Sequence, residues 1–139
     1  MNRIVRLKPE GQGLHEISDA VVEAVDDGLA AGAPRDGLVT LFLRHTSASL
    51  LIQENAAPAA RRDLERWLAR LVPEGDSLYT HLNEGPDDMP GHIRAALTAT
   101  SLGIPLLDGA LALGTWQGIF LWEHRHRPGG RELVVHLGS

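Results

Sequence analysis

The chain contains segments in which apolar residues alternate with polar ones, and short runs that are wholly apolar; both patterns predict strands. Residues 3–8 alternate, and Pro9 with the glycines that follow ends the segment. The compact run at 38–43 predicts a buried strand, and 50–52 continues in the same way. Further strands are expected at 104–107, 111–113, 119–126 and 133–137, with Asp108-Gly109 as a turn and Pro128-Gly129-Gly130 closing a hairpin between the last two.

Other segments repeat their apolar residues every three or four positions, which predicts helices. One such helix is marked by Ile17, Val21, Val25 and Leu29. A second follows Pro58, and Leu64, Trp67, Leu68 and Leu71 line one side of it. A third starts near 87–90 and points Ile93, Leu97 and Thr100 inward. Strands near both ends with two or three helices between them, and no regular βαβ alternation, predict an α+β fold around a largely antiparallel sheet.

Length and charge limit the possible architectures and partners. The 139 residues predict a single domain spanning 1–139, too short for a (β/α)₈ barrel. The net charge of −5 comes without a basic cluster, which argues against a general nucleic-acid or membrane-surface binder. No signal peptide or membrane-length apolar run is visible, so we expect a cytoplasmic protein with no membrane partner.

The residue types restrict the chemistry further. The absence of cysteine excludes a disulfide scaffold, a thiolate metal site and a thiol nucleophile. Seven histidines are present, and two of them, His81 and His92, flank the carboxylates of Glu84, Asp87 and Asp88 at a predicted helix start. Imidazole and carboxylate are the usual ligands of zinc or a similar divalent ion when cysteine is absent, and a helix start favours phosphate. The competing interpretation is a solvated loop.

Three more polar clusters lie where predicted elements meet. The hydroxyls and imidazole of 45–49 suit anion binding or substrate orientation, but the motif alone favours a turn whose hydroxyls bond to the local backbone. Residues 53–55, with Asp63, resemble helix caps. The bend at 114–118 carries an indole and an amide that suit either a ring-shaped ligand or the core.

The predicted strand at 119–126 contains two histidines at alternate positions. Period-two alternation places Phe120, Trp122, His124 and His126 on one face. Such a pair can hold a metal ion, although the arginines beside His126 favour a surface position for that residue. His15 and His136 lie outside the polar clusters of the sequence and are interpreted as structural or surface residues.

The clusters together resemble a known family. The relevant motifs run in order along nearly the whole chain: 45–49, Glu54-Asn55, Glu84-Gly85, 87–90 with His92, Thr100-Ser101, 114–118 and 123–125. Together they resemble the YjbQ-like family, often labelled secondary thiamine-phosphate synthase. One departure is Leu82, where relatives often carry an acidic residue after the histidine.

The resemblance implies a compact α+β sandwich that assembles as a homotrimer, with a polar pocket at or near the subunit contacts. It also implies a divalent metal, Zn²⁺ or Mg²⁺, and a phosphorylated small molecule as ligand. Carried onto this chain, the metal-ligand candidates are His45, His81, His92 and His124. The catalytic candidates are Asp87, Glu54, Ser47 and Gln117, and the substrate-binding candidates are Asn55, Ser101 and Trp116.

The implied activity joins a pyrimidine methyl diphosphate to a thiazole phosphate and expels diphosphate. This chemistry needs a divalent ion and anion-binding groups at the leaving group. The same ligand types suit a metal-dependent hydrolase or phosphatase equally well. A non-catalytic, ligand-binding trimer is the third hypothesis.

Overall fold

The computed structural model describes residues 1–139 as eight strands and three helices. Most elements lie within a few residues of the expected positions. Their bounds are β1 (Asn2–Leu7), β2 (Gly13–Glu16), α1 (Ser18–Ala30), β3 (Gly37–Leu43), β4 (Ala48–Glu54), α2 (Pro58–Leu71), α3 (Asp88–Leu97), β5 (Ser101–Leu107), β6 (Ala110–Leu111), β7 (Gln117–Glu123) and β8 (Arg131–Gly138).

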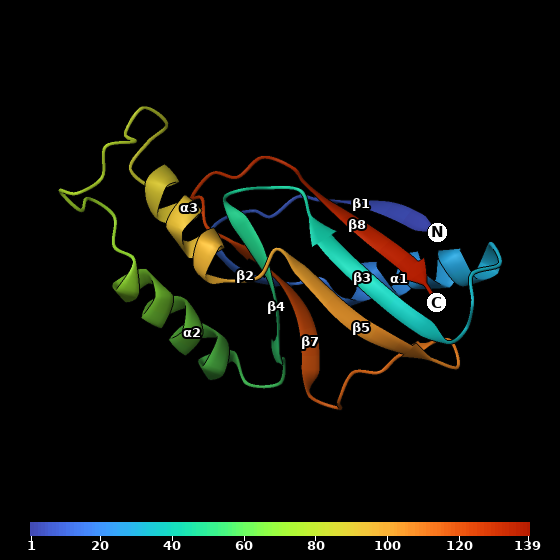
Figure 1. Ribbon diagram of the computed structural model, residues 1–139. Coiled ribbons are helices and arrows are strands. Elements are labelled where there is room, and N and C mark those ends of the chain that lie inside the picture. Colours follow the sequence, from blue (N-terminus) through green and yellow to red (C-terminus); the bar gives the residue numbers. More distant parts are fainter.

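The strands form two sheets, shown together in Figure 1. One sheet has five strands in the order β1-β8-β3-β5-β6, and the other has three in the order β2-β7-β4. Every neighbouring pair is antiparallel, which confirms the predicted α+β fold with a largely antiparallel sandwich. The predicted Asp108-Gly109 turn joins β5 to β6, and φ values of 46° and 81° give both residues the left-handed conformation of a tight hairpin turn.

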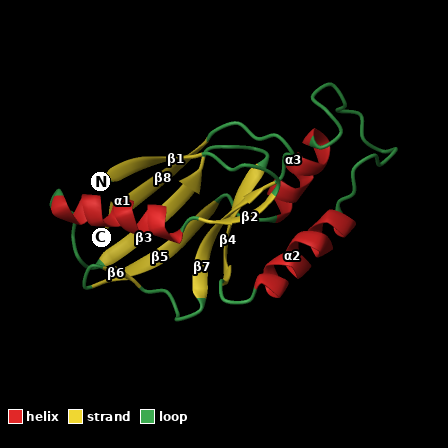
Figure 2. Ribbon diagram, turned by 180° about the vertical axis from the view of Figure 1, so that it is seen from behind, coloured by secondary structure: helices red, strands yellow, loops and turns green.

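The main core lies between the five-stranded sheet on one side and α1 with the three-stranded sheet on the other. Alternate residues of β3, such as Val39 and Leu41, are fully buried there. The apolar face of α1 meets them through Val21 and Val25, and Figure 2 shows α1 lying across this sheet. The four-residue spacing that predicts this helix thus identifies its buried face.

A second, smaller core fills the space between β7 and α2. Phe120 and Trp122 point into it and meet Leu68 and Val72, while Leu121 points the other way into the main core. The predicted alternation of 119–122 is therefore confirmed. It makes β7 a strand that is buried on both faces.

The face that α3 buries differs in part from the expected one: Ile93 packs against the second core as expected, but Leu97 and Thr100 are exposed. The sequence predicts that Leu97 points inward, but this side chain is 59% exposed. The buried residues of α3 are instead Asp88, Pro90, Gly91 and Arg94. The polar first turn of α3 faces the sandwich, because Asp88 in that turn forms ion pairs with residues of the sandwich and the preceding loop.

The predicted hairpin between the last two strands is wrong. Strand β7 already has β2 on one edge and β4 on the other, so neither of its edges is free for β8. Strand β8 pairs with β1 and β3 in the other sheet. The connection 124–130 therefore crosses from one sheet to the other, and the predicted strand 119–126 ends at Glu123.

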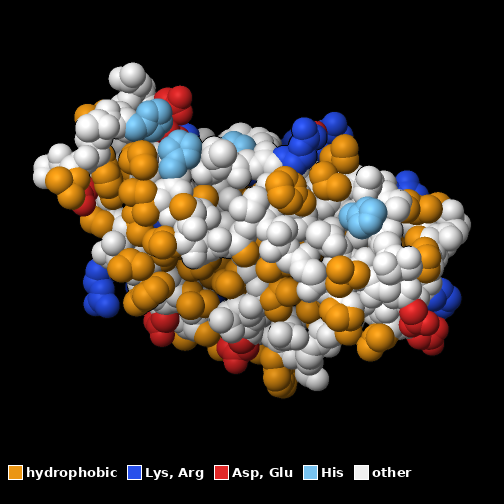
Figure 3. Space-filling model, viewed as in Figure 1, with side chains coloured by type: hydrophobic (Ala, Val, Ile, Leu, Met, Phe, Trp, Pro, Cys, Tyr) orange, Lys and Arg blue, Asp and Glu red, His pale blue; other side chains and the backbone are white.

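The outer face of the five-stranded sheet has no helix over it. Leu38 and Phe42 of β3 and Ile4 of β1 are 45%, 49% and 52% exposed. Figure 3 shows separate hydrophobic side chains over the region that β3 and β5 occupy in Figure 1, and a denser group on the side of α2 and α3. None of the three helices combines the length and apolarity needed to span a bilayer.

Candidate metal centre

His81, Asp88 and His92 come together at the first turn of α3. Asp88 and His92 are four residues apart and therefore share one side of the helix, while His81 reaches them from the preceding loop. Asp88 Oδ2 lies 2.7 Å from His81 Nε2 and 3.1 Å from His92 Nε2. The three potential ligand atoms all lie within 4.8 Å of one another. Two imidazoles and one carboxylate at this spacing suit a divalent ion.

Arg125 holds Asp88 in position from the opposite side. Its Nη1 donates to Asp88 Oδ1 at 2.7 Å, which leaves only Oδ2 facing the histidines. Burial alone would raise the pKa of Asp88, but the His81 hydrogen bond and the charges of His92 and Arg125 outweigh burial and lower it. Asp88 is therefore an anion at neutral pH, as a metal ligand must be.

The hydrogen bond that orients His92 leaves its other nitrogen available as a ligand. Nδ1 lies 3.2 Å from the carbonyl oxygen of Thr46, and a carbonyl only accepts, so Nδ1 carries the proton. In the protonated ring, whose charge lowers the pKa of Asp88, Nε2 donates to the Asp88 carboxylate; in the neutral ring Nε2 presents a lone pair toward that carboxylate. Two acceptors facing each other need a cation or a proton between them. A backbone carbonyl holding the far nitrogen is typical of metal-ligating histidine, so these residues fit a divalent ion.

Asp87, one of the catalytic candidates, faces away from the histidines. Its Oδ2 accepts from the backbone N–H of His126 at 2.8 Å and lies 3.2 Å from Arg125 Nε. Burial opposes ionisation, but the His126 amide and Arg125 prevail and lower the pKa of Asp87. Asp87 therefore fixes Arg125. The sequence places Asp88 in the right cluster but assigns it no role, although its spacing from His92 would have indicated one, and the role of Arg125 was missed.

His45 lies near the centre without joining it. Its Nδ1 faces the backbone N–H of Ser47, and its Nε2 faces Nη1 of Arg131, each at 3.0 Å. Burial and then the charge of Arg131 lower the pKa of His45, so the ring is neutral at pH 7. Arg131 itself forms a buried ion pair with Glu123, 2.7 Å from its Nε. Ser47 is buried beside this network.

His124 is separated from the centre by its burial inside the sandwich. His124 is only 1% exposed, and its Nε2 lies 3.0 Å from Ser49 Oγ. Burial, followed by the charges of Arg94 and Arg131, lowers the pKa of His124 to about 3. The structure thus groups two of the four candidate histidines, His81 and His92, with a carboxylate.

A hollow beside His92 offers room for a substrate. This cavity, of about 500 Å³, is also lined by Arg44, His45 and Thr46 on a polar side and by Phe42 on an apolar side. Ser101 pairs with Phe42 in the register, next to Thr100 at the cavity wall. Both edges of the cavity therefore carry residues from the predicted motifs.

The remaining candidates lie at the other end of the three-stranded sheet. In the β4–β7 register Ala48 pairs with Glu123, whereas Glu54 pairs with Gln117, about 20 Å further along the strands at ~3.3 Å per residue. Asn55 hydrogen-bonds Glu16 at 3.1 Å, and Gln117 accepts from the backbone of Gly114 at 2.7 Å. Trp116 is 64% exposed. Within one chain these residues do not meet the histidine cluster.

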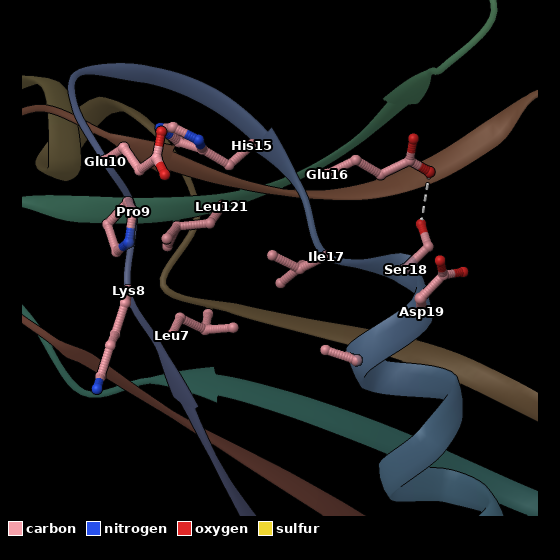
Figure 4. Close-up of a pocket in the computed structure, with 11 residues that line it drawn as sticks. Leu7, Lys8, Pro9, Glu10, His15, Glu16, Ile17, Ser18, Asp19 and Leu121 are labelled. Carbon is pink, nitrogen blue, oxygen red and sulfur yellow. Dashed lines mark hydrogen bonds between the residues drawn. The ribbon is translucent and has the colours of Figure 1, made fainter.

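A larger hollow, of about 560 Å³, lies at the start of α1 and contains none of the candidate residues. Figure 4 shows apolar Leu7, Ile17 and Leu121 in it, with Lys8 at one side. His15 lines it too and contacts the Gly11 carbonyl oxygen at 2.7 Å. No set of three potential metal ligands occurs there, so the centre at α3 remains the candidate site.

The fold and the centre define the class of protein: an antiparallel α+β sandwich with a two-histidine, one-carboxylate cluster. The model of the YjbQ-like UPF0047 protein family matches residues 3–139. The UPF0047 protein sll1880 of Synechocystis is 50% identical over 136 residues, covering 98% of this chain and 90% of that protein. The UPF0047 protein YjbQ of Escherichia coli O157:H7 is 40% identical over 137 residues, covering 97% and 95%. The chain belongs to the YjbQ-like UPF0047 family.

Solved structures agree with this assignment. A crystal structure of an uncharacterized YjbQ/UPF0047 protein from Clostridium acetobutylicum has a TM-score of 0.81 and 33% identity, with 99% of both chains covered. A conserved hypothetical protein from Thermus thermophilus has a TM-score of 0.78 and 36% identity, covering 96% of this chain and 99% of the other. These structures support the fold, and neither description states an activity.

Proposed function

We propose that the chain is a metal-assisted enzyme acting on a phosphorylated small molecule. The observation that carries the proposal is the cluster of His81, Asp88 and His92, in which the carboxylate is ionised and one imidazole is oriented through its far nitrogen. Two imidazole ligands favour zinc over magnesium, which prefers oxygen. A divalent ion bound there would supply positive charge to stabilise phosphate oxygens and a leaving group.

The neighbouring cavity supports an anionic substrate that also has an apolar part. Arg44 borders it and uses Nη1 on Glu132, 3.1 Å away, which leaves other guanidinium donors free. Thr46 adds a hydroxyl, and Phe42 adds a half-exposed ring on which a flat heterocycle can stack. These groups suit a phosphorylated heterocycle better than a sugar or a peptide.

Within this class, thiamine-phosphate synthesis is the first reaction to test, because the family resemblance implies it. The thiazole nitrogen forms a bond to the methylene carbon of the pyrimidine as the bond from that carbon to diphosphate oxygen breaks. Diphosphate departs with the electron pair. The part of this chain is to hold the two precursors together and to stabilise the leaving anion.

A metal-dependent hydrolase or phosphatase is the second candidate. It is favoured by the number of protein ligands, since three-ligand sites keep a position open for water. A non-catalytic, ligand-binding trimer is the remaining alternative.

We also propose a homotrimer. The uncovered apolar face around Leu38 and Phe42 supports association of chains. A neighbouring copy would also give the distant residues Glu54, Trp116 and Gln117 a way to approach the histidine cluster, which they do not reach within one chain.

One experiment separates these functions. The purified protein is dialysed against Zn²⁺ or Mg²⁺, its metal content is measured, and it is incubated with both precursors while thiamine phosphate is followed by mass spectrometry. Asp88→Asn removes the central ligand, and Asp108→Asn is the matched control, since that side chain is 95% exposed. We expect bound metal and product from wild type and control, and neither from Asp88→Asn.

Other outcomes would support the alternative functions. Release of phosphate or alcohol from simple phosphate and acyl esters, without thiamine phosphate, would favour the hydrolase. Ligand binding without turnover would favour the binding module. Wild-type protein that retains no stoichiometric metal after dialysis would refute the metal-assisted function.

A further inference from the structure

Arg94 is a buried cation with almost no partners. The residue is 5% exposed, and its only hydrogen bond runs from Nη2 to the carbonyl oxygen of Val72 at 2.7 Å. Its Nε has no partner, and no carboxylate oxygen lies within 4.0 Å of its guanidinium. Glu74 and Asp87 act on it only from beyond that distance. By contrast, Arg131, equally buried, donates from Nε and Nη2 to the two oxygens of one carboxylate, Glu123. A buried guanidinium that no carboxylate contacts directly is costly, so the site favours an anion placed against it.

A small cavity lies against Arg94. It has a volume of about 90 Å³, and Gln12, Glu65, Trp122 and His124 share its wall with Arg94. Figure 1 places this region where α2 and α3 lie beside β2 and β7. At ~30 Å³ per water molecule the cavity has room for about three waters, or for one small ion with a water.

The other polar groups of the wall have partners of their own. Both oxygens of Glu123 accept from Arg131, and Oε2 of Glu65 accepts from the backbone of Leu14 at 2.9 Å. Gln12 donates to the carbonyl oxygen of His124 at 3.1 Å. Arg94 thus brings most of the unused hydrogen-bond donors to this cavity.

We propose that the cavity binds a small monovalent anion against the Arg94 guanidinium, of the size of chloride, nitrate or formate. The volume excludes a diphosphate or a nucleotide. The carboxylates of Glu65 and Glu123 in the wall disfavour a second negative charge on the ion. Arg94 follows His92 by two positions, about 200° around the helix, so the anion site and the metal centre use different sides of α3.

Thermal unfolding of the full chain in different salts tests this site. The protein is held in sodium gluconate at constant ionic strength and pH 8, and gluconate, which is too large to enter, is replaced stepwise by chloride, bromide or formate. We expect the Tm to rise with saturation, by roughly 5–10 °C at about 100 times the Kd. Arg94→Met should abolish the rise, whereas Arg70→Met, at an exposed position on α2, should keep it.

Bromide soaking gives a second readout on the wild-type protein, which decides the matter even if Arg94→Met fails to fold. We expect an anomalous peak within contact distance of the Arg94 guanidinium. The proposal is overturned if the cavity shows only water, or if wild type and Arg94→Met respond equally to every salt, as surface screening would produce.

Discussion

Acidification should destabilise the fold through His124, because this ring is held neutral in the native state. Its pKa falls from 6.5 to about 3, caused first by burial and then by Arg94 and Arg131, and Ser49 contacts its Nε2. Between these two pH values the unfolded chain binds a proton that the folded chain rejects. The contribution is therefore fully present above pH 6.5 and is lost as the pH falls toward 3.

The size of the effect follows from the two pKa values. At pH 7 about a quarter of the unfolded chains carry the proton on His124, and at pH 5 nearly all do. Integrating between these limits gives a loss of about 2 kcal/mol in the free energy of unfolding. For a domain of this size that is a large fraction of the total stability.

Urea unfolding at pH 7 and pH 5, in a chelating buffer and at one protein concentration, measures the loss. His124→Gln keeps a hydrogen-bonding side chain without a titrating ring, so its stability should fall by about 2 kcal/mol less than that of wild type. The exposed His136 provides the matched control, because His136→Gln should keep the wild-type pH dependence. Equal pH dependence in wild type and His124→Gln would show that the buried ring is not the source.

Three further changes test the site, the core and the assembly. Arg125→Gln should weaken zinc binding roughly 10–100-fold in a chelator competition by releasing Asp88, whereas exposed Arg127→Gln should not. Glu123→Ala should lower the free energy of unfolding in urea by about 3–5 kcal/mol by leaving buried Arg131 unpaired, against at most about 1 kcal/mol for Glu132→Ala at a surface pair. Phe42→Glu should reduce the light-scattering mass to that of a 15.0 kDa monomer, and an unchanged trimer mass would place the interface elsewhere.

Local periodicity is enough to predict most elements, because it reports which side of a segment is buried. It does not predict strand partners. The pattern of 119–137 is that of a hairpin, yet β2 and β4 already occupy both edges of β7, and only the whole sheet reveals this. The predicted face of α3 is right for Ile93, which packs against the second core, and wrong for Leu97. The buried side also carries a carboxylate and a guanidinium, which apolar periodicity does not detect.

The candidate site shows the same limit at the level of single residues. Sequence identifies the right segment, with His81 and His92, but favours Asp87 over its neighbour. Arg125 contacts both carboxylates, and they differ in their other partner: the His126 amide for Asp87 and the two imidazoles for Asp88. His126, which binds Asp87, and Arg125, which orients both, lie more than thirty positions away in the sequence. Their approach is a product of the tertiary fold.

This dependence makes the centre a part of the sandwich and not of α3 alone. Thr46, which orients His92, follows β3 in the five-stranded sheet, and Arg125, which holds Asp88, follows β7 in the three-stranded sheet. The two connections are aligned only when the sheets have packed on each other. A divalent ion at the centre would therefore bind the folded chain far better than the unfolded one. Its binding free energy would add to the stability of the whole sandwich.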